Sequence, residues 1–272
     1  DEQVWVSMHG VPFGMQHMMK KVLIPKLVKK THDNMHLQYR TFIVIDIIES
    51  LLAMQLDDFE KELPEYMHLA YLPTPGLIRL RLTGACKDES LLSANMDKFS
   101  AKLHELVGDK IICDEDMPLA QILGKKLLEK GMTVASAESC TGGNIAHEIT
   151  RIAGSSSYFK GSVVSYANEV KINVLNVSSA DIDVHGVVSE PVVQQMVSGV
   201  CKVMNTDCAI STSGIAGPGG AEPGKPVGTV WIAAKAADNV VSQCFHFPGD
   251  RERVINRATN EGIKMLLKLL ND

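Results

Sequence analysis

Helical and strand patterns alternate along the chain from residue 118 onward, and this alternation limits the folds that the chain can adopt. Apolar residues at helical spacing predict helices at 118–130 (ended by Gly131), 143–153, 168–175, 189–204 and 251–270. Short apolar runs between them predict strands at 132–137, 160–166, 207–212, 227–236 and 240–247. Helices that alternate with strands cover a central sheet, and two adjacent final strands suit an antiparallel hairpin. We therefore expect a three-layer α/β/α domain with a mixed sheet.

The residues before this domain follow a weaker pattern, which predicts a smaller α+β region. The elements expected there are a buried strand at Val4–Met8, a helix at Gln16–Lys30, a half-exposed strand at Leu77–Leu82 and a helix at Ser90–Val107. The β-branched run Ile43–Ile48 fits either a strand or the start of a buried helix. The acidic, turn-prone segment from Cys113 to Pro118 is the expected domain boundary.

Composition narrows the class of protein. The chain has 272 residues, 45% of them hydrophobic and 22% charged, which excludes disorder, collagen and coiled coil. Uncharged apolar runs such as Val227–Ala234 are too short for a membrane span. A net charge of −5 offers no electrostatic reason for tight nucleic-acid binding. Six scattered cysteines without a CxxC pair are typical of reduced thiols in a cytosolic protein. The first residue is Asp1 and not Met, which predicts a fragment or a processed product.

Polar, turn-forming residues gather at the ends of three predicted strands, and the first group directly follows residue 137. A strand-to-helix turn that carries Gly142 and Gly143 lets a ligand approach the backbone and points N–H groups at an anion or an oxyanion. Alternatively, Ser139 or Thr141 caps the helix that follows. Cys140 fits either a nucleophile or a small buried core residue.

The second group begins in a run of three serines around Ser156 and continues to Tyr166 and Lys171. A lysine beside a serine hydroxyl acts as a general base if burial lowers its pKa, and a tyrosine hydroxyl can relay a proton. Tyr166 ends a predicted strand and Lys171 lies one turn into the next helix, so both can face one strand-end cleft. An exposed tyrosine and a solvated lysine fit the same pattern. The Tyr-x4-Lys spacing differs from the Tyr-x3-Lys of short-chain dehydrogenases.

The third group starts at Ser213 and Gly214 and continues into a loop rich in glycine and proline. Such a loop is either a solvated connection or a substrate lid, and it lacks the Gly-Lys-Ser/Thr ending of a P-loop. Arg251 opens the last predicted helix, where it can clamp a phosphate or carboxylate or pair with Asp250 or Glu252. The nine histidines show no HxxxH or HExxH spacing, so no metal site is expected.

Together these three groups resemble the C-terminal domain of the CinA (competence/damage-inducible, or PncC) family, and the resemblance covers residues 116–272. It implies hydrolysis of the carboxamide of nicotinamide mononucleotide to nicotinate mononucleotide and ammonia, a reaction of pyridine nucleotide salvage. It further implies a homodimer that needs no cofactor, with nicotinamide mononucleotide as its partner. The thiols favour a cytoplasmic protein, the short apolar runs speak against a membrane partner, and the net charge makes a nucleic-acid partner unexpected.

The resemblance also implies roles for single residues. Ser139 matches the nucleophile, and Lys171 with Tyr166 matches the pair that activates it. Ser213 stands where the family usually has threonine, and Arg251 matches the arginine of a Gly-Asp-Arg motif expected to bind the substrate phosphate. The other residues that the resemblance places at the substrate are Ser156, as a further hydroxyl, and Thr141, Gly142, Gly143 and Gly214.

The amino-terminal part resembles the middle of the same family. Met8–Met15 is similar to the motif Met-Pro-Gly-Val-Pro-Phe-Glu-Met, with His9 in place of proline and Gly14 in place of glutamate. That motif lies late in a molybdopterin-binding-like domain, so residues 1–35 are interpreted as a remnant of it, without its ADP-ribose pyrophosphatase activity. Residues 36–115 resemble the KH-like connecting domain but lack a GxxG loop, so RNA binding is not implied.

Two further hypotheses stand beside a metal-independent amidohydrolase. One is a catalytically silent CinA-like paralogue that acts as a binding or regulatory module, favoured by the altered Met-His-Gly motif and by Ser213. The other is binding of single-stranded DNA through the middle domain, which the negative net charge disfavours.

Overall fold

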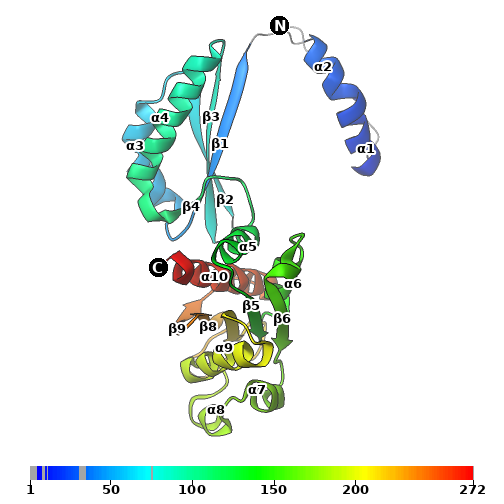
Figure 1. Ribbon diagram of the computed structural model, residues 1–272, viewed down its shortest axis with the longest axis vertical. Helices are drawn as coiled ribbons and strands as arrows, with labels where there is room; N and C mark the ends of the chain where they lie inside the picture. The colour runs from blue at the N-terminus through cyan, green and yellow to red at the C-terminus, as the bar shows by residue number, and fades with distance from the viewer. Residues whose placement is uncertain (1–4, 8–9, 11, 31–34, 75, 272) are drawn as a thin grey trace.

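The computed structural model describes residues 5–7, 10, 12–30, 35–74 and 76–271 (Figure 1). Its first helical region consists of α1 (Pro12–Met18), a π-helical turn (Met19–Leu23) and α2 (Ile24–Lys30), as the sequence predicts from residue 16 onward. The strand expected at Val4–Met8 is not found: its end residues lie outside the described part, and residues 5–7 are exposed and irregular.

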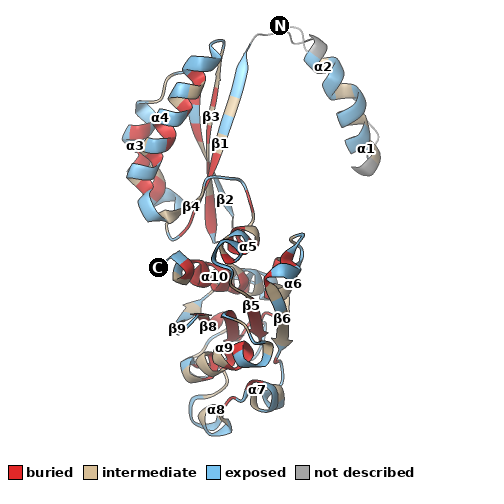
Figure 2. Ribbon diagram, in the orientation of Figure 1, coloured by how far each residue is buried: buried red, intermediate tan, exposed pale blue. Residues whose placement is uncertain are grey.

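A four-stranded sheet and two helices form the next unit. Its elements are β1 (His36–Val44), α3 (Glu49–Lys61), β2 (Met67–Thr74), β3 (Leu77–Cys86), α4 (Glu89–Val107) and β4 (Ile111–Cys113). The strands are antiparallel in the order β2-β3-β1-β4, and both helices pack on one face of the sheet (Figures 1 and 2). The predictions of β3 and α4 are confirmed. The run Ile43–Ile48 ends a strand and then turns at Asp46, whose φ of 59° ends the extended backbone.

Within its described residues, the carboxy-terminal domain holds six α-helices, five strands and a 3-10 turn at Ser155–Ser157. The helices and strands are α5 (Leu119–Lys130), β5 (Val134–Glu138), α6 (Asn144–Thr150), β6 (Phe159–Val164), α7 (Asn168–Leu175), α8 (Ser179–His185), α9 (Glu190–Met204), β7 (Cys208–Gly214), β8 (Thr229–Ala236), β9 (Asn239–His246) and α10 (Arg251–Asn271). The strand order is β6-β5-β7-β8-β9, with β5 parallel to β6 and β7, and with β8 and β9 antiparallel. The expected mixed sheet is confirmed. In this domain, α8 is the α-helix that the sequence analysis missed.

Side chains alternate across this sheet and divide the core in two. Val134 and Ile210 belong to the cluster under α5, α6 and α10, whereas their neighbours Ala135 and Ala209 belong to the cluster under α9. Because both faces are covered by helices, the expected three-layer α/β/α architecture is confirmed. Gly199 lets α7 approach α9 closely, since a Cβ at this position would lie 2.1 Å from the carbonyl oxygen of Leu175.

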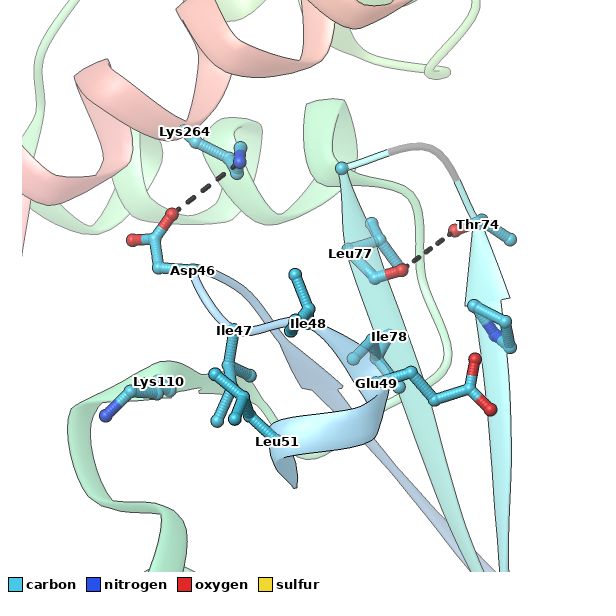
Figure 3. Close-up of a pocket in the computed structure, with 12 residues that line it drawn as sticks. Asp46, Ile47, Ile48, Glu49, Leu51, Thr74, Leu77, Ile78, Lys110 and Lys264 are labelled. Atoms are coloured by element: carbon cyan, nitrogen blue, oxygen red, sulfur yellow. Dashed lines mark hydrogen bonds and ion pairs between the residues drawn. The ribbon is translucent and has the colours of Figure 1, made fainter. Parts of the chain in front are cut away.

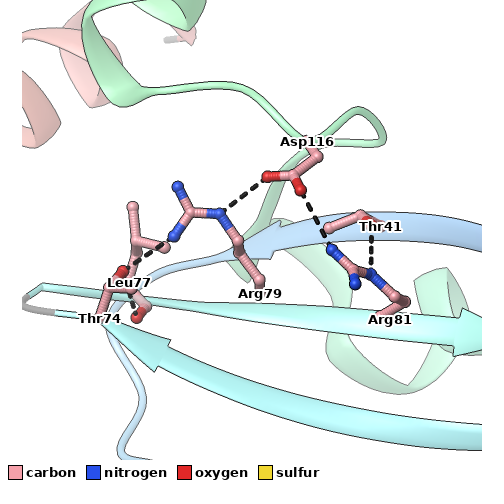
Figure 4. A network of polar contacts seen from close by, with 6 residues as sticks. All are labelled: Thr41, Thr74, Leu77, Arg79, Arg81 and Asp116. Carbon is pink, nitrogen blue, oxygen red and sulfur yellow. Dashed lines mark hydrogen bonds and ion pairs between the residues drawn. The ribbon is translucent and has the colours of Figure 1, made fainter. Parts of the chain in front are cut away.

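Ionic contacts join the two units. Asp116 lies before α5 and accepts from Arg79 at 2.8 Å and from Arg81 at 3.3 Å, both on β3 (Figure 4). On the other side of the junction, Asp46 faces Lys264 of α10 at 3.6 Å (Figure 3). A cavity of about 690 Å³ lies beside this second contact, and its lining includes Asp46, Lys264 and the apolar side chain of Leu77 (Figure 3).

The described residues give two further findings. None of their helices combines the length and the apolar composition that a bilayer crossing requires. No three His, Cys, Asp or Glu side chains in the described ranges gather closely enough to hold a metal ion.

Candidate active site

The carboxyl ends of three parallel strands meet at one edge of the larger sheet. Ser139 directly follows β5, Tyr166 comes two residues after β6, and Ser213 lies near the end of β7. The Ser139 N–H donates to the carbonyl oxygen of Thr212 at 3.0 Å, which ties the turn after β5 to the neighbouring strand. Ligands of open α/β sheets bind at such edges.

A serine and a buried lysine are in contact at this edge. Lys171 of α7 has its Nζ 3.2 Å from Ser139 Oγ and 2.7 Å from the carbonyl oxygen of Ser165. The Lys171 side chain is 1% exposed, and no carboxylate of the described residues forms an ion pair with it. Burial therefore lowers the pKa of Lys171, because it disfavours the ammonium form. A neutral amine beside a serine hydroxyl can take its proton. The alternative of a solvated lysine is wrong.

Arg251 and Tyr166 form a second pair at the same edge. The Arg251 guanidinium donates to Tyr166 Oη at 3.0 Å and to the carbonyl oxygen of Gly217 at 2.9 Å. The ion pair that the sequence allowed for Arg251 is not observed, since Asp250 instead faces Arg253 at 3.6 Å. A guanidinium has five N–H donors, so Arg251 keeps donors for a ligand.

Glu138 is the site residue that the sequence analysis passed over. Its fully buried carboxylate accepts from the N–H groups of Gly143, Ile145 and Ala146 at 2.9, 3.0 and 2.9 Å. The first turn of α6 is thus capped by the residue before the turn, and the expectation that Ser139 or Thr141 caps this helix is wrong. These N–H groups are also occupied, so the helix start does not receive a ligand anion. The sequence feature that could have indicated a role for Glu138 is its position as a glutamate at the end of a buried strand.

The remaining turn residues have distinct positions. Thr141 is buried, and its Oγ1 donates to Glu138 at 2.8 Å and lies 2.8 Å from Thr212 Oγ1, so this hydroxyl faces the protein. Gly142 has a φ of 60°, and a Cβ there would meet open space. The N–H groups of Cys140 and Thr141 donate to no other residue in the described ranges, and the Cys140 N–H interacts with its own sulfur. The donors available to an oxyanion therefore lie one and two residues after Ser139.

Cys140 fits a core residue better than a nucleophile. It is 6% exposed, and burial raises its pKa to about 12, so the thiol stays protonated at neutral pH. Ser139 remains the better nucleophile candidate of the two.

Of the sequence-predicted site residues, Lys171 alone has a side chain that contacts Ser139 within the described part of the chain. Tyr166 contacts Arg251 and not Lys171, and Ser213, Gly214 and Ser156 lie apart from Ser139. The Ser213 hydroxyl donates to the carbonyl oxygen of Val187 at 2.6 Å and is buried. Gly214 permits close strand packing, because a Cβ there would lie 2.7 Å from the carbonyl oxygen of Thr229. Ser156 precedes β6 and so lies at the amino end of that strand, whereas the site lies at the carboxyl end. The predicted strand at 160–166 already follows Ser156, so the order of the elements could have excluded Ser156 from this edge.

Known proteins share both parts of this fold. The family model for the CinA C-terminal domain matches residues 116–270, and that for the damage-inducible protein CinA KH domain matches residues 39–112. A CinA-like protein of Flavobacterium psychrophilum is 42% identical over 269 residues, which is 98% of this chain and 64% of the relative. A putative competence-damage inducible protein of Caldicellulosiruptor saccharolyticus is 34% identical over 276 residues, 99% of this chain and 65% of the relative. The chain therefore spans somewhat less than two thirds of these relatives.

Solved structures agree with the sequence matches. The competence damage-inducible protein A of Klebsiella pneumoniae is 37% identical, with a TM-score of 0.55 over 56% of this chain and 95% of that chain. The competence/damage inducible protein of Agrobacterium tumefaciens is 35% identical, with a TM-score of 0.55 over 57% of this chain and 94% of that chain. Because the C-terminal family model spans more than half of the residues and relatives of that name align with nearly all of them, the chain belongs to the CinA family.

Proposed function

We propose that this protein hydrolyses the carboxamide of nicotinamide mononucleotide, with Ser139 as nucleophile and Lys171 as base. The observation that carries the proposal is the 3.2 Å contact between Lys171 Nζ and Ser139 Oγ at a buried strand end. A lysine of lowered pKa supplies the neutral amine that this chemistry requires. The family resemblance supplies the substrate, and the arginine at the same edge suits its phosphate.

The proposed reaction has two halves. Ser139 Oγ attacks the carboxamide carbon while its proton passes to Lys171 Nζ, and the resulting oxyanion accepts from the N–H groups of Cys140 and Thr141. The carbon–nitrogen bond then breaks, and the proton held by Lys171 passes to the leaving nitrogen, which departs as ammonia. Water attacks the acyl-enzyme, Lys171 takes a proton from it, and the proton returns to Ser139 as nicotinate mononucleotide leaves.

Tyr166 and Arg251 are proposed to hold the nucleotide. Arg251 donates to Tyr166 and to the Gly217 carbonyl, so its guanidinium is fixed at the site before any substrate binds. The Tyr166 hydroxyl accepts from Arg251, which leaves its own proton available to the reacting amide. Both side chains are at least partly exposed, as a substrate contact requires.

Arg251→Ala should raise KM for nicotinamide mononucleotide by about ten- to a hundredfold, because a charge-assisted contact contributes roughly 1.5–3 kcal/mol. The change for nicotinamide riboside, which lacks the phosphate, should be much smaller. Steady-state ammonia release from both substrates measures the difference. Equal effects on the two would show that Arg251 does not bind the phosphate.

The alternative of a catalytically silent paralogue predicts that the wild-type protein releases no ammonia, whereas the proposed function predicts that it does. The Ser213 hydroxyl holds Val187 and does not touch Ser139, so loss of the usual threonine methyl leaves the reacting groups in place. We expect ammonia release from the mononucleotide in a screen that also contains nicotinamide, its riboside and the dinucleotides. Binding of the mononucleotide without any release of ammonia would favour the alternative.

Homodimer formation stays a prediction, which light scattering of the purified chain tests.

A further inference from the structure

The Glu138 carboxylate is surrounded by hydrogen-bond donors. Besides the N–H groups of Gly143, Ile145 and Ala146, it accepts from three hydroxyls: those of Thr141, Ser136 and Ser162 at 2.8, 3.0 and 3.3 Å. Glu138 is fully buried, and no lysine or arginine of the described residues pairs with it. The side chain is therefore held by backbone N–H groups and by hydroxyls.

These contacts fix both ends of the Ser139 turn. Glu138 precedes Ser139 in the chain, while its Oε2 accepts from Thr141 Oγ1 and from the Gly143 N–H on the far side of the same turn. The turn contains two glycines with positive φ, which by themselves leave its backbone free to adopt other conformations. The Glu138 carboxylate therefore links the residue before Ser139 to Thr141 and Gly143, which follow it.

The same contacts decide which N–H groups can serve an oxyanion. The carboxylate takes the donors of Gly143, Ile145 and Ala146, and the Ser139 N–H is taken by Thr212. The N–H groups of Cys140 and Thr141 are left, in the segment between the two fixed ends. A shift of the carboxylate would therefore move the nucleophile and the oxyanion donors together.

We propose that Glu138 is a positioning residue of the active site: an internal carboxylate that sets the geometry of Ser139 and of the Cys140 and Thr141 N–H groups. The inference rests on the proposed serine chemistry. It differs from a purely structural capping role, because a cap that only stabilises α6 would change the unfolding temperature and leave the rate constants of the folded protein unaltered.

Glu138→Gln is the direct test, because the amide keeps the size of the side chain but replaces one acceptor oxygen with a donor group. Ser162→Ala is the matched control: it removes the 3.3 Å contact to Oε1, the oxygen that does not bind Thr141 or Gly143, together with the hydrogen bond from Ser136. We expect kcat of Glu138→Gln to fall at least about thirtyfold with KM changed less than threefold, whereas Ser162→Ala stays within twofold of wild type. Circular dichroism verifies that both variants are folded.

A second readout does not depend on the substrate. An alkyl fluorophosphonate reacts with an activated serine: a bond forms between Ser139 Oγ and phosphorus, fluoride leaves, and Lys171 takes the proton. Mass spectrometry should find the label on Ser139, formed at least about tenfold more slowly in Glu138→Gln. If that variant does not fold, Thr141→Val and Thr141→Ser replace it, since valine removes the hydroxyl between Glu138 and Thr212 and serine restores it.

The outcomes separate the two proposals. Wild-type protein that releases no ammonia from the mononucleotide defeats the proposed function, whether or not Ser139 takes the label. Wild-type protein that releases ammonia, together with a Glu138→Gln variant or a Thr141→Val variant that reacts equally fast, defeats the positioning role of Glu138 and leaves the proposed function standing. Slower reaction in Glu138→Gln, or in Thr141→Val with recovery in Thr141→Ser, supports it.

Discussion

Ser139→Ala should reduce deamidation of nicotinamide mononucleotide by about a hundredfold or more, with little change in fold or in substrate binding. Its hydroxyl contacts Lys171 at the strand-end turn, and alanine leaves no nucleophile there. Ammonia release under saturating substrate measures the loss, and calorimetric titration with the mononucleotide measures binding.

Cys140→Ala is the matched control for this prediction. The thiol lies next to Ser139 in the chain, is buried and stays protonated, so its replacement should keep most of the activity. If the Ser139→Ala variant is active and the Cys140→Ala variant is inactive, the nucleophile is Cys140 and not Ser139.

Lys171→Met should lower kcat by about a hundred- to ten-thousandfold, the range of a general base. It should also abolish the rise of the rate with pH that the ionisation of Lys171 causes. In wild-type protein the rate should rise with pH through one ionisation below the free-lysine value of about 10.4 and then level off. A pH series of kcat/KM for both proteins checks this. Arginine at position 171 should not restore activity, because it cannot deprotonate.

The same ionisation affects stability with a definite sign. The folded pKa of Lys171 lies below the unfolded one, so between the two values the unfolded chain binds the extra proton and unfolding becomes less favourable as pH rises. Below the folded pKa the cost of the buried ammonium is present in full. Denaturant unfolding of Lys171→Met should lack this pH-dependent increase. An identical increase in both proteins would contradict a neutral buried lysine.

Chelation by EDTA should leave the activity of the purified protein unchanged, since the proposed steps use only side chains and backbone N–H groups. The measurement is ammonia release before and after dialysis against the chelator. Inhibition that a divalent metal reverses would contradict this mechanism.

The larger domain was predicted well from the sequence because the spacing of apolar residues differs between its helices and its strands. The limits of α7 were predicted without error, and those of α5 within one residue, since Gly131 adopts the left-handed conformation that ends that helix. The missed helix α8 has seven residues, none of them buried, so it lacks an apolar stripe to detect. In the smaller unit, α3 and β2 are amphipathic elements that were not predicted from the sequence.

The site was predicted in part for an equally physical reason. Ser139, Tyr166 and Lys171 lie at strand ends or just beyond them, and parallel strands bring such ends together. Ser156 was misplaced because a residue before a strand lies at the opposite edge from a residue after it. Glu138 was passed over because half of its hydrogen-bond partners are backbone N–H groups at the start of the following helix. Such groups cannot be recognised from the types of the residues.

The two contacts of Arg251 bear on the thermodynamics of recognition. A free arginine on the surface loses side-chain entropy when it binds a ligand, which opposes binding by about 0.5–1.5 kcal/mol. Here Tyr166 and the Gly217 carbonyl already restrict the guanidinium, so this ordering takes place during folding. An anion that meets Arg251 therefore encounters a preorganised donor, and the enthalpy of the new hydrogen bonds is opposed by a smaller entropic term.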